Sequence, residues 1–119
     1  MKRTDATTTL AELQSAALAF RDARDWAQFH HPKDLAMAIG IEAAELAELF
    51  LWRSEAVDAS SDSVLRDKAS EEIADVLLYL LYMADALGID VATAVFGKMA
   101  KNEARFPVGA ARGVGIDGD

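Results

Sequence analysis

LAMAIGIEAAELAELFLW, residues 35–52, is apolar almost throughout, and its only charges are three glutamates. EIADVLLYLLYMA, residues 72–84, has the same character, with a single aspartate after its leading glutamate. At about 100° per residue of an α-helix, the acidic side chains of each segment form one narrow stripe, and apolar residues cover the rest of the circumference. We therefore predict two helices that are buried on more than one side, either inside a bundle or at a subunit interface.

The carboxylates of these two segments are costly in apolar surroundings unless something neutralises them. Glu42 and Glu45 are three residues apart, as are Glu72 and Asp75. Each pair therefore presents two carboxylates at one point of its helix, and two antiparallel helices would present all four together. Oxygen ligands without histidine or cysteine suit a hard cation, so Mg²⁺ or Mn²⁺ fits better than zinc or copper. We expect these four residues to bind such a metal.

Composition limits the other possibilities. The 119 residues have the length of one ordinary domain, and there is no cysteine for disulfides or thiolate metal sites. The net charge of -8 repels nucleic-acid backbones and anionic lipids, so we expect neither nucleic acid nor membrane as a partner. We find no signal-peptide pattern and no stretch of roughly 18 apolar residues, and we predict a soluble cytoplasmic protein.

The remaining helix signals predict an all-α fold of four helices. Thr9 and Glu12 have the spacing of a capping box, and the helix that they begin is expected to run through Trp26. Pro32 favours the start of the second helix, expected to end near Arg53.

The third helix is expected over residues 64–87, with a Ser or Asp cap before it and Gly88 in a left-handed conformation at its end. Asp90 caps the fourth helix, which ends near residue 106. The glycine-rich tail 108–119 has no packing pattern, so we expect it to be flexible or to be ordered only by a neighbour, outside a domain formed by residues 1–107.

Four segments of the chain resemble the MazG-like all-α NTP pyrophosphohydrolases, most closely the dCTP pyrophosphatase branch of that group. They read FHHPKDL (29–35), GIEAAELAELFLW (40–52), EIADVLLYL (72–80) and KMAKNEARFP (98–107). The resemblance implies Mg²⁺-dependent hydrolysis of a deoxynucleoside triphosphate, dCTP or a modified dCTP, to the monophosphate and pyrophosphate. It implies that the four carboxylates above hold the Mg²⁺, and that the fold is a four-helix MazG-like bundle.

Both the resemblance and the wide apolar faces of the two acidic helices imply an oligomer, because large apolar patches are rarely left exposed on monomers. We expect a homotetramer built as a dimer of dimers, in which each site is completed by more than one subunit. Tyr82, on the stripe of the third helix, is expected at such an interface.

The resemblance also implies further residues that bind the substrate. Trp26, His30 and Trp52 resemble the base pocket of the family, in which aromatic faces would enclose a pyrimidine. Tyr79, one turn after the metal-binding aspartate, is placed for a sugar or phosphate contact. Three polar residues that share a face of the fourth helix are candidates for contacts with phosphate, sugar or base. They are Lys98, Asn102 and Arg105.

The tryptophans and the basic residues among these could instead have purely structural roles. Tryptophans at helix ends often pack in cores or interfaces, and basic residues near a helix C-terminus favour the helix dipole without any ligand. Glu45 or Glu48 could take the proton of the attacking water, and the sequence does not choose between them.

Rival functions also remain. One is a non-catalytic helical oligomerisation module, and another is a related phosphoribosyl-ATP or dUTP pyrophosphohydrolase that shares the metal cluster. A di-iron carboxylate bundle is disfavoured because it needs Glu-x-x-His pairs, and both histidines lie together at 30–31.

Overall fold

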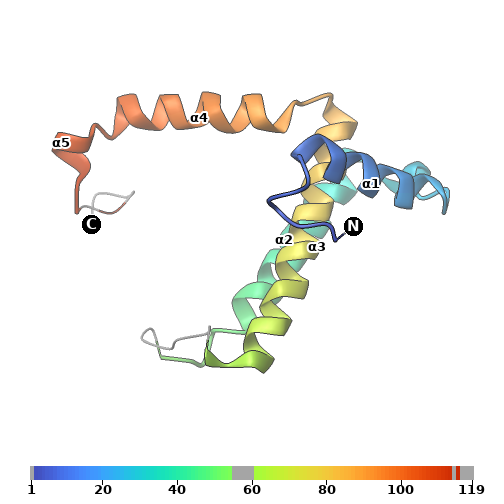
Figure 1. Ribbon diagram of the computed structural model, residues 1–119, viewed down its shortest axis with the longest axis horizontal. Coiled ribbons are helices and arrows are strands. Elements are labelled where there is room, and N and C mark those ends of the chain that lie inside the picture. Colours follow the sequence, from blue (N-terminus) through green and yellow to red (C-terminus); the bar gives the residue numbers. More distant parts are fainter. Residues whose placement is uncertain (1, 55–60, 114, 116–119) are drawn as a thin grey trace. The chain divides into compact units, whose positions relative to one another are not determined.

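The computed structural model describes residues 2–54, 61–113 and 115 (Figure 1). Every regular element among these residues is helical, which confirms the predicted all-α class. The chain divides into two compact units, Met1–Gly88 and Ile89–Asp119, and each is described by itself.

Helix α1, Leu10–Asp22, begins at the predicted capping box. The Thr9 hydroxyl accepts a hydrogen bond from the Glu12 amide, and the Glu12 carboxylate accepts one from the Thr9 amide. The helix ends at Asp22, so the predicted extension through Trp26 was wrong. Asp25 takes a left-handed backbone conformation, φ 53°, which interrupts the helix, and a short 3₁₀ helix η1, Ala27–Phe29, follows.

Helix α2, Pro32–Glu48, has its proline in the first turn as predicted. It ends about a turn before the expected Arg53, and residues 49–52 form turns. The Arg53 side chain donates to the Leu49 carbonyl at 3.2 Å and pairs with Asp62 at 3.2 Å. These contacts fold the chain back toward the start of the next helix.

Helix α3, Ser63–Leu87, is capped by Asp62, whose carboxylate accepts from the Leu65 amide. It ends at Gly88 with φ 65°, as the sequence predicts. Helices α2 and α3 lie antiparallel along each other, and α1 packs near the C-terminal end of α3 (Figure 1). Six residues of this unit form the buried apolar core among the described residues: Ala17, Leu35, Leu65, Leu81, Tyr82 and Ala84.

Tyr82 belongs to this core, so its predicted place at a subunit interface was wrong. Its hydroxyl donates to the Ala17 carbonyl at 3.1 Å and thereby joins α3 to α1. A second bond between the two helices runs from the Gln14 amide to the Leu81 carbonyl, at 3.4 Å.

The second unit contains α4, Val91–Arg105, and the short α5, Val108–Ala111. Asp90 caps α4 as predicted, by accepting from the Thr93 amide. The helical turn α5 lies at the start of the tail that was expected to be flexible or ordered only by a neighbour. Residues 114 and 116–119 of that tail, and residues 55–60 of the predicted loop, lie outside the described residues.

Large apolar side chains remain exposed on the two acidic helices. Met37 and Ile41 on α2 are 59% and 58% exposed, and Ile73 and Leu80 on α3 are 55% and 45% exposed. The helices of the first unit therefore leave apolar faces of α2 and α3 uncovered. In the part of the chain that the structure describes, no single helix is long and apolar enough to cross a membrane; only α3 and α4 taken together reach that length and composition.

Candidate metal and nucleotide site

The antiparallel pairing of α2 and α3 brings three of the predicted carboxylates together. Glu42 and Glu45 come from α2 and Glu72 from α3, and one carboxylate oxygen of each lies within 4.8 Å of the others. Glu42 and Glu72 are half-buried, whereas Glu45 is exposed. We call these three residues the carboxylate cluster.

Asp75, the fourth predicted ligand, follows Glu72 by about one turn of α3 and is also half-buried. It is not one of the three residues whose oxygens converge within 4.8 Å. Its negative charge nevertheless acts on both Glu42 and Glu72. The structure thus places Asp75 beside the cluster.

The carboxyl groups of the cluster perturb one another electrostatically. Burial raises the pKa of Glu42 to about 7, and the negative charges of Glu45, Asp75 and Glu72 add to this effect. Burial and the charge of Glu45 also raise the pKa of Glu72. The crowded carboxylates therefore resist full ionisation near neutral pH.

Two oxygens of the cluster are enclosed without a donor. Oε2 of Glu42 and Oε2 of Glu72 are buried and have no hydrogen-bond partner. Buried polar atoms are normally paired, and acidic oxygens that converge without a donor match the ligand set of a hard cation. These oxygen ligands and their arrangement therefore fit Mg²⁺ or Mn²⁺.

Glu48 is the last residue of α2 and is exposed. It follows Glu45 by about one helical turn but does not belong to the carboxylate cluster. Of the two candidate proton acceptors, Glu45 therefore lies in the cluster and Glu48 flanks it.

Three aromatic side chains lie together on the α2–α3 pair, beyond the acidic residues toward the C-terminal end of α3. The His30 ring lies 4.7 Å from the Tyr82 ring at an angle of 40°, and Tyr79 meets Tyr82 edge-on at 6.4 Å. Tyr79 is four residues after Asp75 on α3, so these rings begin one turn from the acidic side chains. Burial lowers the pKa of His30, and the charge of Arg21 lowers it further.

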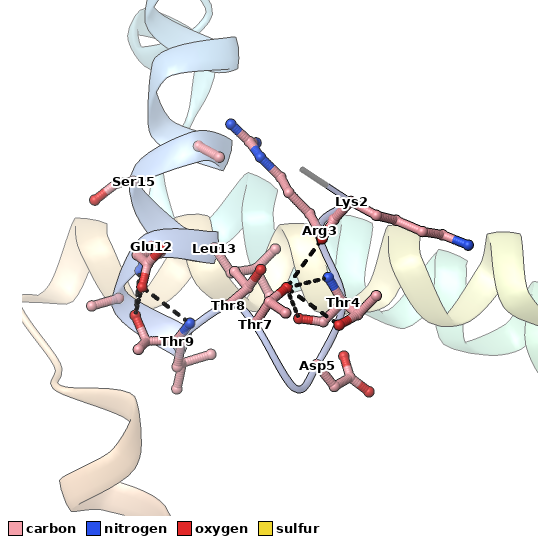
Figure 2. A pocket seen from close by; sticks show the side chains of 13 residues that line it. Lys2, Arg3, Thr4, Asp5, Thr7, Thr8, Thr9, Glu12, Leu13 and Ser15 are labelled. Carbon is pink, nitrogen blue, oxygen red and sulfur yellow. Dashed lines mark hydrogen bonds between the residues drawn. The ribbon is translucent and has the colours of Figure 1, made fainter.

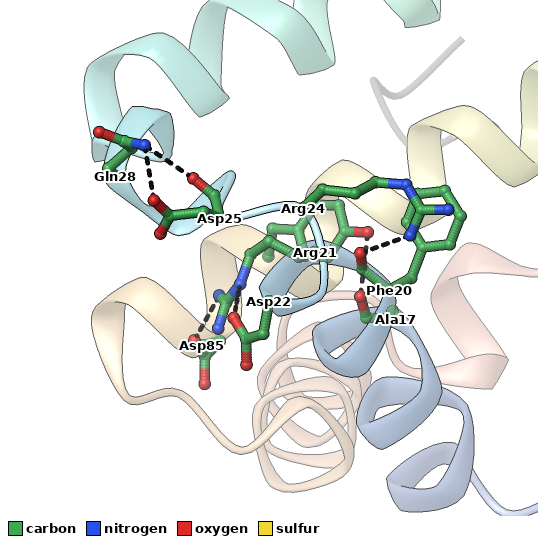
Figure 3. Close-up of polar contacts among 9 residues, drawn as sticks. Ala17, Phe20, Arg21, Asp22, Arg24, Asp25, Gln28 and Asp85 are labelled. Atoms are coloured by element: carbon green, nitrogen blue, oxygen red, sulfur yellow. Dashed lines mark hydrogen bonds and ion pairs between the residues drawn. The ribbon is translucent and has the colours of Figure 1, made fainter.

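Trp26 belongs to a separate exposed cluster with Phe20 and Arg24, which the sequence did not predict as site residues. Its ring meets Phe20 edge-on at 5.9 Å. The Arg24 guanidinium lies 3.6 Å from the centre of the Phe20 ring, and Figure 3 shows Arg24 beside Phe20. Trp26 remains 44% exposed. Trp26 is therefore partly open to solvent, and the Arg24 guanidinium lies 5.8 Å from the centre of its ring.

Trp52 is not brought near Trp26 within one chain. It follows the C-terminus of α2 and is 92% exposed, whereas Trp26 precedes the N-terminus of the same helix. The 17 residues of α2 span about 25 Å at 1.5 Å per residue. The three residues predicted to form a base pocket therefore do not meet in a single copy.

The predicted contacts of α4 belong to the second unit. Lys98 and Arg105 are exposed, Asn102 is half-buried, and the Arg105 guanidinium lies 4.9 Å from the Phe106 ring. A groove of about 680 Å³ between α4 and α5 is lined in part by Asn102. Contact of these side chains with a substrate at the carboxylate cluster stays a prediction.

Two further features could not be found from sequence patterns. Arg21 of α1 pairs with Asp85 of α3 and with Asp22, each at 2.9 Å (Figure 3). A hollow of about 950 Å³ lies between the N-terminal segment and α1 (Figure 2). The Thr7 hydroxyl in its wall bonds with Thr4, and no predicted site residue lines this hollow.

Comparison with known proteins shows similarity to one family and to several pyrophosphatases. Residues 37–118 match the MazG-like family. The chain is 39% identical to dCTP pyrophosphatase 1 of Rattus norvegicus over 107 residues and 38% identical to that of Homo sapiens over 106 residues. These matches cover 88% and 87% of this chain but 63% and 62% of the relatives, so the chain spans less than two thirds of their length. A solved pyrophosphatase structure from Archaeoglobus fulgidus is 40% identical, with a TM-score of 0.74 over 89% of this chain and 99% of that one.

Proposed function

This chain belongs to the MazG-like family, and we propose that it hydrolyses dCTP or a modified dCTP to the monophosphate and pyrophosphate. The observation that carries this proposal is the convergence of three carboxylates from two apolar helices, with two enclosed oxygens that lack a donor. The similarity to proteins named dCTP pyrophosphatase 1 supports the choice of substrate.

The metal that we propose is Mg²⁺, with Mn²⁺ as an alternative, held by Glu42, Glu45, Glu72 and Asp75. When bound, such a cation neutralises triphosphate charge, polarises a phosphoryl oxygen and lowers the pKa of a bound water. The carboxylates of the chain supply the negative site that attracts it. Glu45 or Glu48 accepts the proton of the water, whose oxygen bonds to the α or β phosphorus. The bond from that phosphorus to the bridging oxygen breaks, and the bridging oxygen leaves with the other product.

The sugar and base extend from the phosphates toward Tyr79, His30 and Trp26. Tyr79 lies one turn of α3 from Asp75, a separation similar to that between the phosphates and the sugar of a nucleotide. On α4, the side chains of Lys98, Asn102 and Arg105 contact phosphate, sugar or base in this proposal. We place the domain in residues 1–107 and the protein in the cytoplasm, as the sequence predicts.

We further propose a homotetramer, a dimer of dimers, in which Trp52 of one copy faces Trp26 of another. The uncovered apolar side chains of α2 and α3 support association, and the length of α2 separates the two tryptophans of one chain. Mixing Trp26→Ala and Trp52→Ala proteins after reversible dissociation tests this arrangement. A mixed pair contains one intact site, so activity absent from each variant should return; a pocket built within one chain would stay defective.

A substrate panel tests the activity itself. The four canonical dNTPs, 5-substituted dCTP, dUTP and phosphoribosyl-ATP are each incubated with Mg²⁺, and monophosphate and pyrophosphate are measured against a Glu45→Gln control. We expect the highest kcat/KM for dCTP or a 5-substituted dCTP. Preference for dUTP or phosphoribosyl-ATP would favour the related hydrolases, and no pyrophosphate from any substrate would favour a non-catalytic module.

A further inference from the structure

Helix α1 buries little apolar surface against the rest of its unit. Ala17 is the only buried residue of this fully described helix, whereas the larger side chains of Leu10, Leu13 and Phe20 remain exposed. A single alanine removes little apolar area from water and therefore contributes little to the packing of a helix. The orientation of α1 on α3 consequently depends on its polar contacts.

The polar contact at the C-terminal end of α1 is an ion pair. The Arg21 guanidinium donates from Nη1 to Oδ2 of Asp85 on α3 and from Nε to Oδ1 of Asp22, each at 2.9 Å (Figure 3). The Arg21 side chain is only 12% exposed, so water screens this pair less than it screens a pair on the open surface. Two bonds made at once fix the rotation of the guanidinium as well as its position. The pair therefore pins the end of α1 to α3.

The backbone of the same residue holds the turn that follows α1. The Arg21 carbonyl accepts hydrogen bonds from the Trp26 amide at 3.1 Å and from the Arg24 amide at 3.2 Å. The Asp25 amide donates to the Asp22 carbonyl at 3.1 Å. These bonds close a tight turn, so Trp26 keeps a fixed position relative to Arg21. A shift of Arg21 against α3 would therefore carry Trp26 with it.

We infer that Arg21 is a positioning residue: its ion pair with Asp85 holds the turn that carries Trp26 in place on α3 and thereby sets the affinity for the nucleotide. This inference rests on the proposed function, in which Trp26 contacts the substrate. Asp85 lies ten residues beyond Asp75, about 15 Å along the axis of α3. The pair is therefore too far from the proposed metal ligands to take part in the chemical step.

Steady-state hydrolysis of dCTP by variants of the pair tests the inference. Arg21→Gln and Asp85→Asn each break the ion pair, so fewer molecules hold the turn in the position that binds substrate. We expect KM to rise about two- to fivefold in each variant, with kcat unchanged. Arg21→Lys keeps the charge and should recover most of the loss, and the double variant Arg21→Gln/Asp85→Asn should be no worse than either single variant. Asp22→Asn is the matched control, because it changes a partner of Arg21 within α1 but leaves the contact with α3, and its KM should stay at the parent value.

Acrylamide quenching of Trp26 fluorescence adds a readout that needs no turnover. In a Trp52→Phe background Trp26 is the only tryptophan of the chain. Arg21→Gln should raise its quenching constant with helicity unchanged by circular dichroism, whereas Arg21→Lys should leave both unchanged.

A parent-like KM in Arg21→Gln or Asp85→Asn, a loss confined to kcat, or unchanged quenching in Arg21→Gln would each overturn the inference while leaving the hydrolase activity intact. A parent that hydrolyses no nucleotide would instead refute the proposed function, and with it the effect of Arg21 on substrate affinity.

Discussion

Replacing Tyr82 with phenylalanine removes one hydroxyl and leaves the ring that supports His30 in place. This hydroxyl donates to the Ala17 carbonyl at 3.1 Å between two buried residues, so it links α3 to α1. Burial raises the pKa of Tyr82, which keeps the hydroxyl protonated and able to donate at neutral pH. The substitution therefore tests a single contact that positions α1 on the α2–α3 pair.

The expected loss is about 1 kcal/mol in the free energy of unfolding, the usual net value of a buried hydrogen bond. The loss stays near this value because the Ala17 carbonyl lies within α1 and can still accept a hydrogen bond inside that helix. For a chain of this length such a loss lowers Tm by about 4 °C.

Thermal and urea unfolding in EDTA, at one fixed protein concentration, measure this change without contributions from metal binding or altered association. Tyr79→Phe is the matched control, since the structure shows no hydrogen bond from the Tyr79 hydroxyl to another described residue. The Tyr79 variant should unfold close to the parent. If Tyr82→Phe also unfolds at the parent's midpoint, the hydroxyl does not stabilise the packing of α1 and this reasoning is refuted.

Further predictions concern the acidic site and association. Asp75→Asn should abolish hydrolysis with helicity unchanged by circular dichroism, and its metal-free stability should hold or rise because one like charge is lost; an active variant would contradict the ligand assignment. The folded-state pKa of Glu42, about 7, exceeds its ordinary value of 4.5, so ionisation opposes folding. Metal-free protein should therefore lose stability as pH rises from about 4.5 to 7. The Tm of Glu42→Gln should depend less on pH than the Tm of the parent, and an equally steep pH dependence in the variant would count against Glu42 as the cause. Because folding and assembly are coupled in the proposed tetramer, Tm should rise with protein concentration, and an active monomer at micromolar concentration in sedimentation experiments would exclude the tetramer.

Helix starts and one helix end could be predicted because they depend on residues adjacent in sequence. The capping box at Thr9 and the caps at Asp90 and Gly88 are each fixed within a few positions. The ends of α1 and α2 could not be predicted in this way. Asp25 adopts a left-handed conformation without being glycine, and Arg53 pairs with Asp62 nine residues away.

The carboxylate cluster was predictable in part because Glu42 and Glu45 stand out within a helix that is otherwise apolar. Their proximity to Glu72 follows from the antiparallel pairing of two such helices. The role of Tyr82 was not predictable, since periodicity shows that a residue is buried but not whether its own α1 or another subunit covers it. The pairing of Arg21 with Asp85, 64 residues apart, likewise depends on the tertiary fold.

Pyrophosphate release from dCTP during a Mg²⁺ titration tests the central claim, that the carboxylate cluster holds the metal on which hydrolysis depends. The parent is compared with Glu72→Gln, which alters a proposed ligand, and with Glu71→Gln, which alters the adjacent exposed glutamate. The parent and Glu71→Gln should release pyrophosphate with a saturable dependence on Mg²⁺ and none in EDTA, whereas Glu72→Gln should release none. Full activity of Glu72→Gln, or equal activity of the parent in EDTA, would contradict the claim.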